Sequence, residues 1–209
     1  MSGIIISIIE QGLIYGIMAL GIYISYKILD FPDLSVDGTF PLGAAVTAAL
    51  MMRGVNPWLC LPASAAAGCI AGAVTGILHV KLKIKDLLAG ILTMTALYSV
   101  NYRIAGAPNQ FLMSYPTIFS LPESMPPMIL TYRYILVILI ISVLMKYALD
   151  WYLSTKSGFL LRSVGDNEAL VVTLAQSPGK IKIIGLSIAN GLVALSGSLA
   201  CQRSMQFDI

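Results

Sequence analysis

The chain has 209 residues, of which 57% are hydrophobic and 11% are charged, and its mean hydropathy is +0.85. These values exclude an ordinary soluble globular domain and indicate an integral membrane protein in a lipid bilayer. The net charge is only +3, and the basic residues do not form a patch interleaved with aromatic residues, so we expect no nucleic-acid partner.

Five apolar runs have the length of roughly 20 residues that a helix needs to cross a bilayer. A sixth candidate, residues 39–52, is too short to cross alone, so the stretch before it must enter the membrane with it. We therefore predict an all-α, polytopic transmembrane bundle of about six spans, one of them short or broken, in a single domain over residues 1–209. The five long runs are residues 4–29, 57–80, 87–105, 128–149 and 181–201.

The stretch between the first two runs, residues 31–43, reads FPDLSVDGTFPLG. Pro32 and Pro41 cannot donate backbone hydrogen bonds, so a helix should break here. Irregular backbone at membrane depth occurs only where it is buried in protein or lines a water-filled cavity, which predicts a pathway or gate element. The alternative is a cytoplasmic loop in which Asp37 is the N-cap of the short helix. The candidate gate residues are Asp33, Ser35 and Asp37.

Glycines recur at four-residue spacing in two of the predicted helices. Gly12 and Gly16 form one such stripe, and Gly68, Gly72 and Gly76 form the other. Small residues at this spacing let helix backbones approach closely, so we expect both stripes to pack against neighbouring helices.

The run 87–105 contains many polar residues for a membrane helix. Thr95, Tyr98 and Tyr102 lie on one face, which we expect to point into the bundle. This face could bind neighbouring helices or line a route for a polar solute, and Asn190 in the last run raises the same question, with interhelical hydrogen bonding favoured. The candidate pathway residues of this run are Thr95, Tyr98, Asn101 and Tyr102.

The basic residues are distributed unequally between alternate ends of the predicted spans. By the positive-inside rule the end with nine of them is cytoplasmic. The N-terminus and an irregular cap over residues 107–127 are then outside, and residues 150–182 are inside. The nine are Lys27, Lys81, Lys83, Lys85, Lys146, Lys156, Arg162, Lys180 and Lys182, against Arg53, Arg103, Arg133 and Arg203 at the other end.

The cytoplasmic stretch 160–182 predicts an amphipathic helix of two to three turns. Asp166 or Asn167 can cap it, Glu168 suits its N-terminal end, and Pro178 with Gly179 should end it. Its apolar face could lie on the membrane surface or dock in a groove of a soluble partner. That face consists of Leu170, Val171 and Leu174.

Catalytic and cofactor chemistry is not indicated. Gly179 and Lys180 lack the other residues of a phosphate-binding loop, so the chain should not use ATP by itself. His79 is the single histidine, and the three cysteines stand alone in apolar runs without metal-ligand spacing. We therefore expect no enzyme activity, no metal and no cofactor.

The segment LRSVGDNEAL, residues 161–170, and the span over residues 180–199 resemble the coupling loop and following span of permease subunits of ABC importers of the branched-chain amino acid type. Residues 19–45 and 91–110 are similar to a branch of this family, some of whose members are associated with aromatic amino acid import. The resemblance covers nearly the whole chain. It differs at Ala175, where the family usually has glycine, and family members continue through further membrane helices, which suggests a fragment or a shortened form.

The resemblance implies a multi-pass permease in the cell membrane of a prokaryote that imports a small solute such as an amino acid. Two permease copies would form the pathway, a cytoplasmic ABC ATPase would dock on the coupling helix, and an extracytoplasmic solute-binding protein would deliver the solute. The residues implied in the ATPase contact are Gly165, Asp166, Asn167, Glu168 and Ala169.

Two other classes remain open on the residues alone. An ion-coupled carrier or channel would bind its cation through Asp33 and Asp37 and would not need an ATPase. A membrane scaffold would use the same amphipathic helix for docking and would show no solute flux.

Overall fold

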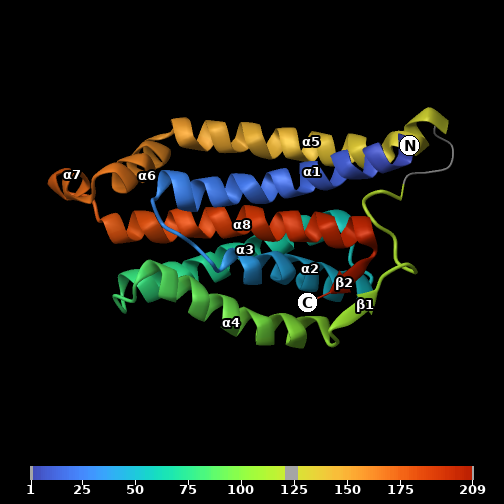
Figure 1. Cartoon of the computed structure of the whole chain (residues 1–209), viewed down its shortest axis with the longest axis horizontal. Helices are drawn as coiled ribbons and strands as arrows, with labels where there is room; N and C mark the ends of the chain where they lie inside the picture. The colour runs from blue at the N-terminus through green and yellow to red at the C-terminus, as the bar shows by residue number, and fades with distance from the viewer. Residues whose placement is uncertain (1, 121–126, 209) are drawn as a thin grey trace.

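The computed structural model describes residues 2–120 and 127–208, and it confirms the all-α polytopic bundle. Its long helices run along a common axis (Figure 1). The helices are α1 (Ser2–Ile22), the π-helix η1 (Tyr23–Ile28), α2 (Val36–Met52), α3 (Pro57–Val80), α4 (Asp86–Ala105), α5 (Pro127–Ser154), α6 (Lys156–Asp166), α7 (Glu168–Thr173) and α8 (Pro178–Ser204). Two short strands, β1 (Asn109–Phe111) and β2 (Gln206–Asp208), complete the fold.

Four stretches of the described helices are long and apolar enough to cross a bilayer: Ile4–Ile28, Pro57–Val80, Tyr132–Ser154 and Pro178–Ser204. The one predicted long span that is not among these four is α4, which has 20 residues. Its polar side chains lower its mean hydropathy. The predicted short helix is α2, which has 17 residues.

Helix α8 lies at the centre of the bundle, and α3, α2 and α1 pack against it (Figure 1). Gly68 and Gly72 of α3 allow this close packing, because a Cβ atom at either position would overlap the backbone of α8. The expectation for the other stripe is wrong. Apart from the neighbouring backbone of α1 itself, no described atom lies within 4 Å of the Cβ position at Gly12 or Gly16, because α1 contacts α8 and α5 through other faces.

The two ends of the bundle differ in their structures (Figure 1). The connection between α3 and α4 lies at the same end as α6 and α7, whereas the N-terminus, β1 and β2 lie at the opposite end. β1 and β2 pair antiparallel, with Gln110 opposite Phe207, so the predicted cap over residues 107–127 contains a strand. Pro122 and Pro126 of that cap lie outside the described residues.

An ion pair between a buried glutamate and a partly exposed arginine, which the sequence analysis did not single out, joins α1 to α8 near the β1–β2 end. Both Nε and Nη2 of Arg203 lie 2.6 Å from Oε2 of Glu10, and Glu10 is buried. The guanidinium also stacks over the ring of Tyr134 on α5, 4.5 Å from the ring centroid. These contacts tie three helices together at one end of the bundle.

The predicted amphipathic helix is α7, which begins after Asn167, and it is preceded by a second helix, α6, that the sequence did not predict. Thr155 caps α6 by accepting a hydrogen bond from the Gly158 N–H at 3.4 Å. The prediction that Pro178 and Gly179 end the helix is wrong, because α7 ends at Thr173 and Pro178 is the first residue of α8. Ala175 between them has a φ of 55°, a left-handed conformation that favours glycine.

Candidate functional site

The break between α1 and α2 comes earlier than the two prolines suggested. The π-helix η1 ends at Ile28, and Asp30 has a φ of 51°. Helix α2 begins at Val36, three residues before the predicted start, and Pro41 lies inside it. The irregular backbone is therefore confined to residues 29–35, between a widened helical turn and a short helix.

Asn190 of α8 holds this irregular segment through side-chain hydrogen bonds. Its Nδ2 donates to Oδ2 of Asp33 at 2.8 Å and to the Leu186 carbonyl at 3.1 Å. Its Oδ1 lies within hydrogen-bonding distance of the hydroxyls of Thr39, at 2.7 Å, and Ser35, at 3.2 Å. The amide thus joins the start of α2 to α8. This confirms the expectation that Asn190 makes interhelical hydrogen bonds.

The position of Asn190 places the irregular segment deep in the bundle. Asn190 is the thirteenth residue of α8, counted from Pro178, in a helix of 27 residues. Asp33 also accepts the Ser35 N–H through Oδ1 at 2.8 Å, so both of its oxygens have partners. The alternative with Asp37 as N-cap is wrong, because Ser35 is the N-cap and Asp37 lies in the first turn of α2.

A cavity of about 330 Å³ lies between α2 and α4. It brings together four of the predicted pathway residues, from two separate stretches of sequence. The sequence analysis did not relate these stretches to each other, because the contact between α2 and α4 is tertiary. The lining residues are Asp37, Gly38, Pro41, Met94, Thr95, Tyr98 and Asn101.

The remaining predicted pathway residues lie elsewhere. Asp33 and Ser35 bind Asn190 and do not line the α2–α4 cavity. Tyr102 is 50% exposed and also lies outside the cavity lining. The irregular segment and the cavity are therefore two neighbouring features joined by the first turn of α2.

The expectation that Thr95, Tyr98 and Tyr102 point into the bundle is wrong for the single chain. All three are exposed, and Tyr98 has 63% of its surface accessible. Helix α4 turns its smaller and apolar residues inward instead, and a Cβ at Gly38 of α2 would lie 3.0 Å from Met94 Cα. The residues of α4 that are buried are Ala89, Gly90, Thr93, Leu97, Asn101 and Ala105.

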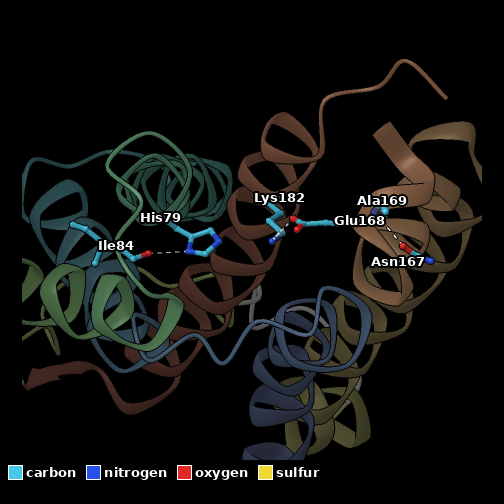
Figure 2. A network of polar contacts seen from close by, with 6 residues as sticks. All are labelled: His79, Ile84, Asn167, Glu168, Ala169 and Lys182. Atoms are coloured by element: carbon cyan, nitrogen blue, oxygen red, sulfur yellow. Dashed lines mark hydrogen bonds and ion pairs between the residues drawn. The ribbon is translucent and has the colours of Figure 1, made fainter. Parts of the chain in front are cut away.

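The predicted coupling residues lie at the α6–α7 end of the bundle (Figure 2). Asn167 Oδ1 accepts the Ala169 N–H at 3.0 Å, and Glu168 forms an ion pair with Lys182 of α8. On the other side of α8, His79 Nδ1 lies 3.0 Å from the Ile84 carbonyl. A depression of about 860 Å³ lies between α7 and the end of α3 that carries His79. Its lining includes Glu168, Ala169, Val172, His79, Lys83 and Lys182.

The apolar face predicted for the coupling helix is divided. Val171 is buried in a cluster with residues of η1, α5, α6 and α8, whereas Leu174 lies beyond the end of α7 and is 54% exposed. The side chain of Leu170 is outside the described part of the structure, and Asp166 is exposed. Gly165 packs so closely on η1 that a Cβ would overlap the Ile28 carbonyl oxygen.

The fold and these sites define a polytopic α-helical membrane protein with a broken helix in its core and short helices at one end. A family model described as the permease component of branched-chain amino acid transport systems matches residues 4–208. The chain therefore belongs to this permease family.

Several individual proteins are similar to the chain. A tyrosine transport system permease protein of Clostridioides difficile is 46% identical over 97% of this chain and 65% of its own length. An uncharacterized protein of Rickettsia prowazekii is 39% identical over 99% of this chain and 70% of its own length. A ribose import permease protein of Haemophilus influenzae is 26% identical over 95% of this chain and 61% of its own length. The chain thus spans about two thirds of these relatives, and no solved structure matches it.

Proposed function

We propose that the chain is the transmembrane permease subunit of an ATP-binding-cassette importer for a small solute, an amino acid, in the cell membrane of a prokaryote. Membership of the permease family and the similarity to a tyrosine transport permease support this function. A separate cytoplasmic ATPase hydrolyses the ATP, an extracytoplasmic binding protein delivers the solute, and a second permease copy completes the pathway.

The observation that carries the proposal is the apolar surface at the α6–α7 end of the bundle. Val172 is 60% exposed and Leu174 is 54% exposed, next to the buried Val171 that anchors α7 to the bundle. Val172 lies on α7 and Leu174 directly follows it. A short helix that is anchored to the bundle and presents exposed apolar side chains is suited to docking in a groove of a soluble partner. The ATPase is the partner that a permease of this class requires.

The packing of α6 supports a mechanical link from the docking surface to the broken helix. Gly165 of α6 lies against the Ile28 carbonyl at the end of η1, so α6 cannot move toward η1 without displacing it. The chain then runs from η1 through residues 29–35 to Asp33, which Asn190 binds. ATPase-driven movement of α6 would shift this segment as a rigid body, which is how packed elements transmit switching.

The exposed side of the α2–α4 cavity supports the pathway and the second permease copy. Asp37 is exposed on the single chain, at the start of a membrane helix. A charged side chain facing lipid at the bilayer centre costs at least about 2.5 kcal/mol, so such residues face water-filled cavities or other protein. This face is where we place the solute route and the second copy.

The bonding of Asp33 favours this function over an ion-coupled carrier. Both carboxylate oxygens of Asp33 accept hydrogen bonds, from the Ser35 N–H and from Asn190. A cation bound there would have to displace these donors, so Asp33 is better suited to hold the irregular segment than to bind a coupling ion.

The test is co-purification of the tagged chain from its native membranes in mild detergent. We expect the intact chain to recover an ATPase, identified by mass spectrometry and by ATP hydrolysis in the eluate. The double variant Val172→Asp, Leu174→Asp should lose it, because two carboxylates would have to be buried in the docking groove.

The control is Met113→Asp, the same type of substitution at an exposed residue two positions after β1, the strand that lies at the opposite end of the bundle. This variant should retain the ATPase. Recovery of no ATPase with the intact chain, or equal recovery with the double variant, would contradict the proposed function.

A further inference from the structure

A groove between α3 and α4 leads to a row of lysines at the α6–α7 end of the bundle. We propose that the groove and the lysines together bind an anionic phospholipid, with an acyl chain in the groove and the phosphate at the lysines. The inference goes beyond the proposed transport function and does not depend on it. The lysines are Lys81, Lys83 and Lys85, in the connection between the two helices.

The α3–α4 groove is apolar. Its volume is about 370 Å³, and its floor is a buried cluster of Leu42, Ala71 and Leu97. On the α3 side Ile70 is 67% exposed. The α4 side presents exposed apolar residues at four-residue spacing, which places them on one face of the helix. These residues are Leu92, Ala96, Val100 and Ile104.

The groove has a dry floor. Thr93 is the one polar side chain among the described residues that line it. Its hydroxyl donates to the Ala89 carbonyl at 3.0 Å and accepts from the Thr75 hydroxyl at 3.0 Å, so its hydrogen bonds are made inside the protein. A groove of this kind gives a water molecule few polar partners and suits a hydrocarbon chain.

The length of the groove matches one leaflet of a bilayer. From Leu92 to Ile104 it extends roughly 18 Å, at the helical rise of about 1.5 Å per residue. One leaflet is half of a hydrocarbon core that is about 30 Å thick. The groove begins at Leu78 on α3, and Lys81 follows three residues later. An acyl chain in the groove therefore places its phosphate at the connection.

The connection between α3 and α4 presents its charges in a fixed loop. Lys81, Lys83 and Lys85 are exposed, and none of them forms an ion pair within residues 2–120 and 127–208. His79 Nδ1 lies 3.0 Å from the Ile84 carbonyl, which holds the loop against the end of α3. Three ammonium groups without carboxylate partners are thus gathered within five residues.

The nearby carboxylates do not neutralise these lysines. Asp86 Oδ1 accepts the Leu87 N–H at 2.9 Å, and Glu168 pairs with Lys182. Lysines directly after a membrane helix attract anionic lipid headgroups, because each ammonium group donates to phosphate oxygens. A zwitterionic headgroup has no net charge to match them.

The groove and the α2–α4 cavity lie on different faces of α4. Thr95, Tyr98 and Asn101 line the cavity, whereas the groove is lined by the apolar row that begins at Leu92. A second permease copy on the polar face would therefore leave the groove open to lipid.

The test is native mass spectrometry of the purified chain in a maltoside detergent, titrated with dioleoyl phosphatidylglycerol or dioleoyl phosphatidylcholine. The two lipids have the same acyl chains, and the first is anionic whereas the second is zwitterionic. We expect phosphatidylglycerol to bind about tenfold more tightly or better. Glycerol 3-phosphate, which has the phosphate without acyl chains, should not displace it at equal concentration.

The first variant removes the charges, through Lys81→Gln, Lys83→Gln and Lys85→Gln together. It should lose the preference for phosphatidylglycerol. The matched control removes three exposed lysines outside the groove lining, on η1, α5 and α6, and it should keep the preference. The control substitutions are Lys27→Gln, Lys146→Gln and Lys156→Gln.

The second variant fills the groove and leaves the lysines in place. Ala96 is exposed in the groove lining, so Ala96→Phe should weaken phosphatidylglycerol binding without disturbing the packed core. Its control is Ala148→Phe, the same substitution at an exposed alanine of α5, which should bind the lipid as the intact chain does.

Several results would overturn the inference. They are equal affinity of the intact chain for the two lipids, displacement by glycerol 3-phosphate, an equal loss in the two triple lysine variants, and unchanged binding in Ala96→Phe. If the first triple variant kept its lipid preference but lost the ATPase in co-purification, the lysines would be a protein contact instead. None of these results bears on whether the intact chain recovers an ATPase, so the proposed function is tested separately.

Discussion

At the scale of single residues, Asn190 explains how a carboxylate and two hydroxyls can lie in the core of a membrane bundle. Asp33, Ser35 and Thr39 all bind this one amide, which is fully buried. Buried polar groups are stable only when their hydrogen bonds are satisfied, so this asparagine sets the position of the irregular segment.

We predict that Asn190→Leu lowers the stability of the bundle by about 2 kcal/mol or more, because it leaves Asp33 without its side-chain donor. The measurement is the midpoint of thermal unfolding in detergent. Ser187→Ala, three residues earlier on α8, removes a hydroxyl that bonds only to the Ile183 carbonyl of its own helix among the described residues, and it should have little effect. Equal midpoints for the two variants would show that the amide network does not stabilise the segment.

At the scale of elements, the contact between α3 and α8 depends on backbone approach. Gly68 and Gly72 face the carbonyls of Asn190 and Leu186, and Gly43 of α2 faces that of Ala194 in the same way. Lipid provides little hydrophobic driving force between helices, so close packing of this kind supplies much of the association energy. It also aligns Asn190 with the irregular segment.

We predict that Gly72→Ala destabilises the chain by about 1–3 kcal/mol, because the added methyl group overlaps the Leu186 carbonyl oxygen. Gly16→Ala is the matched control, since no described atom outside the neighbouring backbone of α1 lies within 4 Å of its Cβ position and alanine favours the helix. Thermal unfolding in detergent distinguishes them. A loss of stability in Gly16→Ala as large as in Gly72→Ala would contradict this account.

At the scale of the whole molecule, the two ends of the bundle should face different compartments. Lys81, Lys83 and Lys85 follow α3 at the end where α6 and α7 lie, whereas Arg203 lies at the end of β1 and β2. Basic residues are retained on the cytoplasmic side during insertion, so the α6–α7 end should be cytoplasmic.

We predict that a membrane-impermeant maleimide labels Gln206→Cys in intact cells, and Lys81→Cys only in inverted membrane vesicles. Both positions are exposed. Labelling is measured above that of the unsubstituted chain, in which Cys60 and Cys201 are buried. The reverse pattern would place α7 outside and would remove the ATPase-docking surface from the cytoplasm.

The sequence by itself predicted the membrane bundle, the break before α2 and a cap on α7 at Asp166 or Asn167, of which the structure has Asn167. These features depend on composition, on the backbone limits of proline and on local hydrogen bonding, which act within a few residues. The left-handed Ala175 also agrees with its replacement of a glycine usual in the family. In each case the physical cause is local in the chain.

Only the tertiary structure decided which faces meet. The packing of α2 on α4 formed the cavity around Asp37 and Asn101 and left Tyr102 outside its lining. The same glycine spacing packs against α8 in α3 and is open in α1. Periodicity gives the face on which a residue lies, but in lipid both polar and small-residue faces can pack, so the partner of each face depends on the complementarity of whole helices.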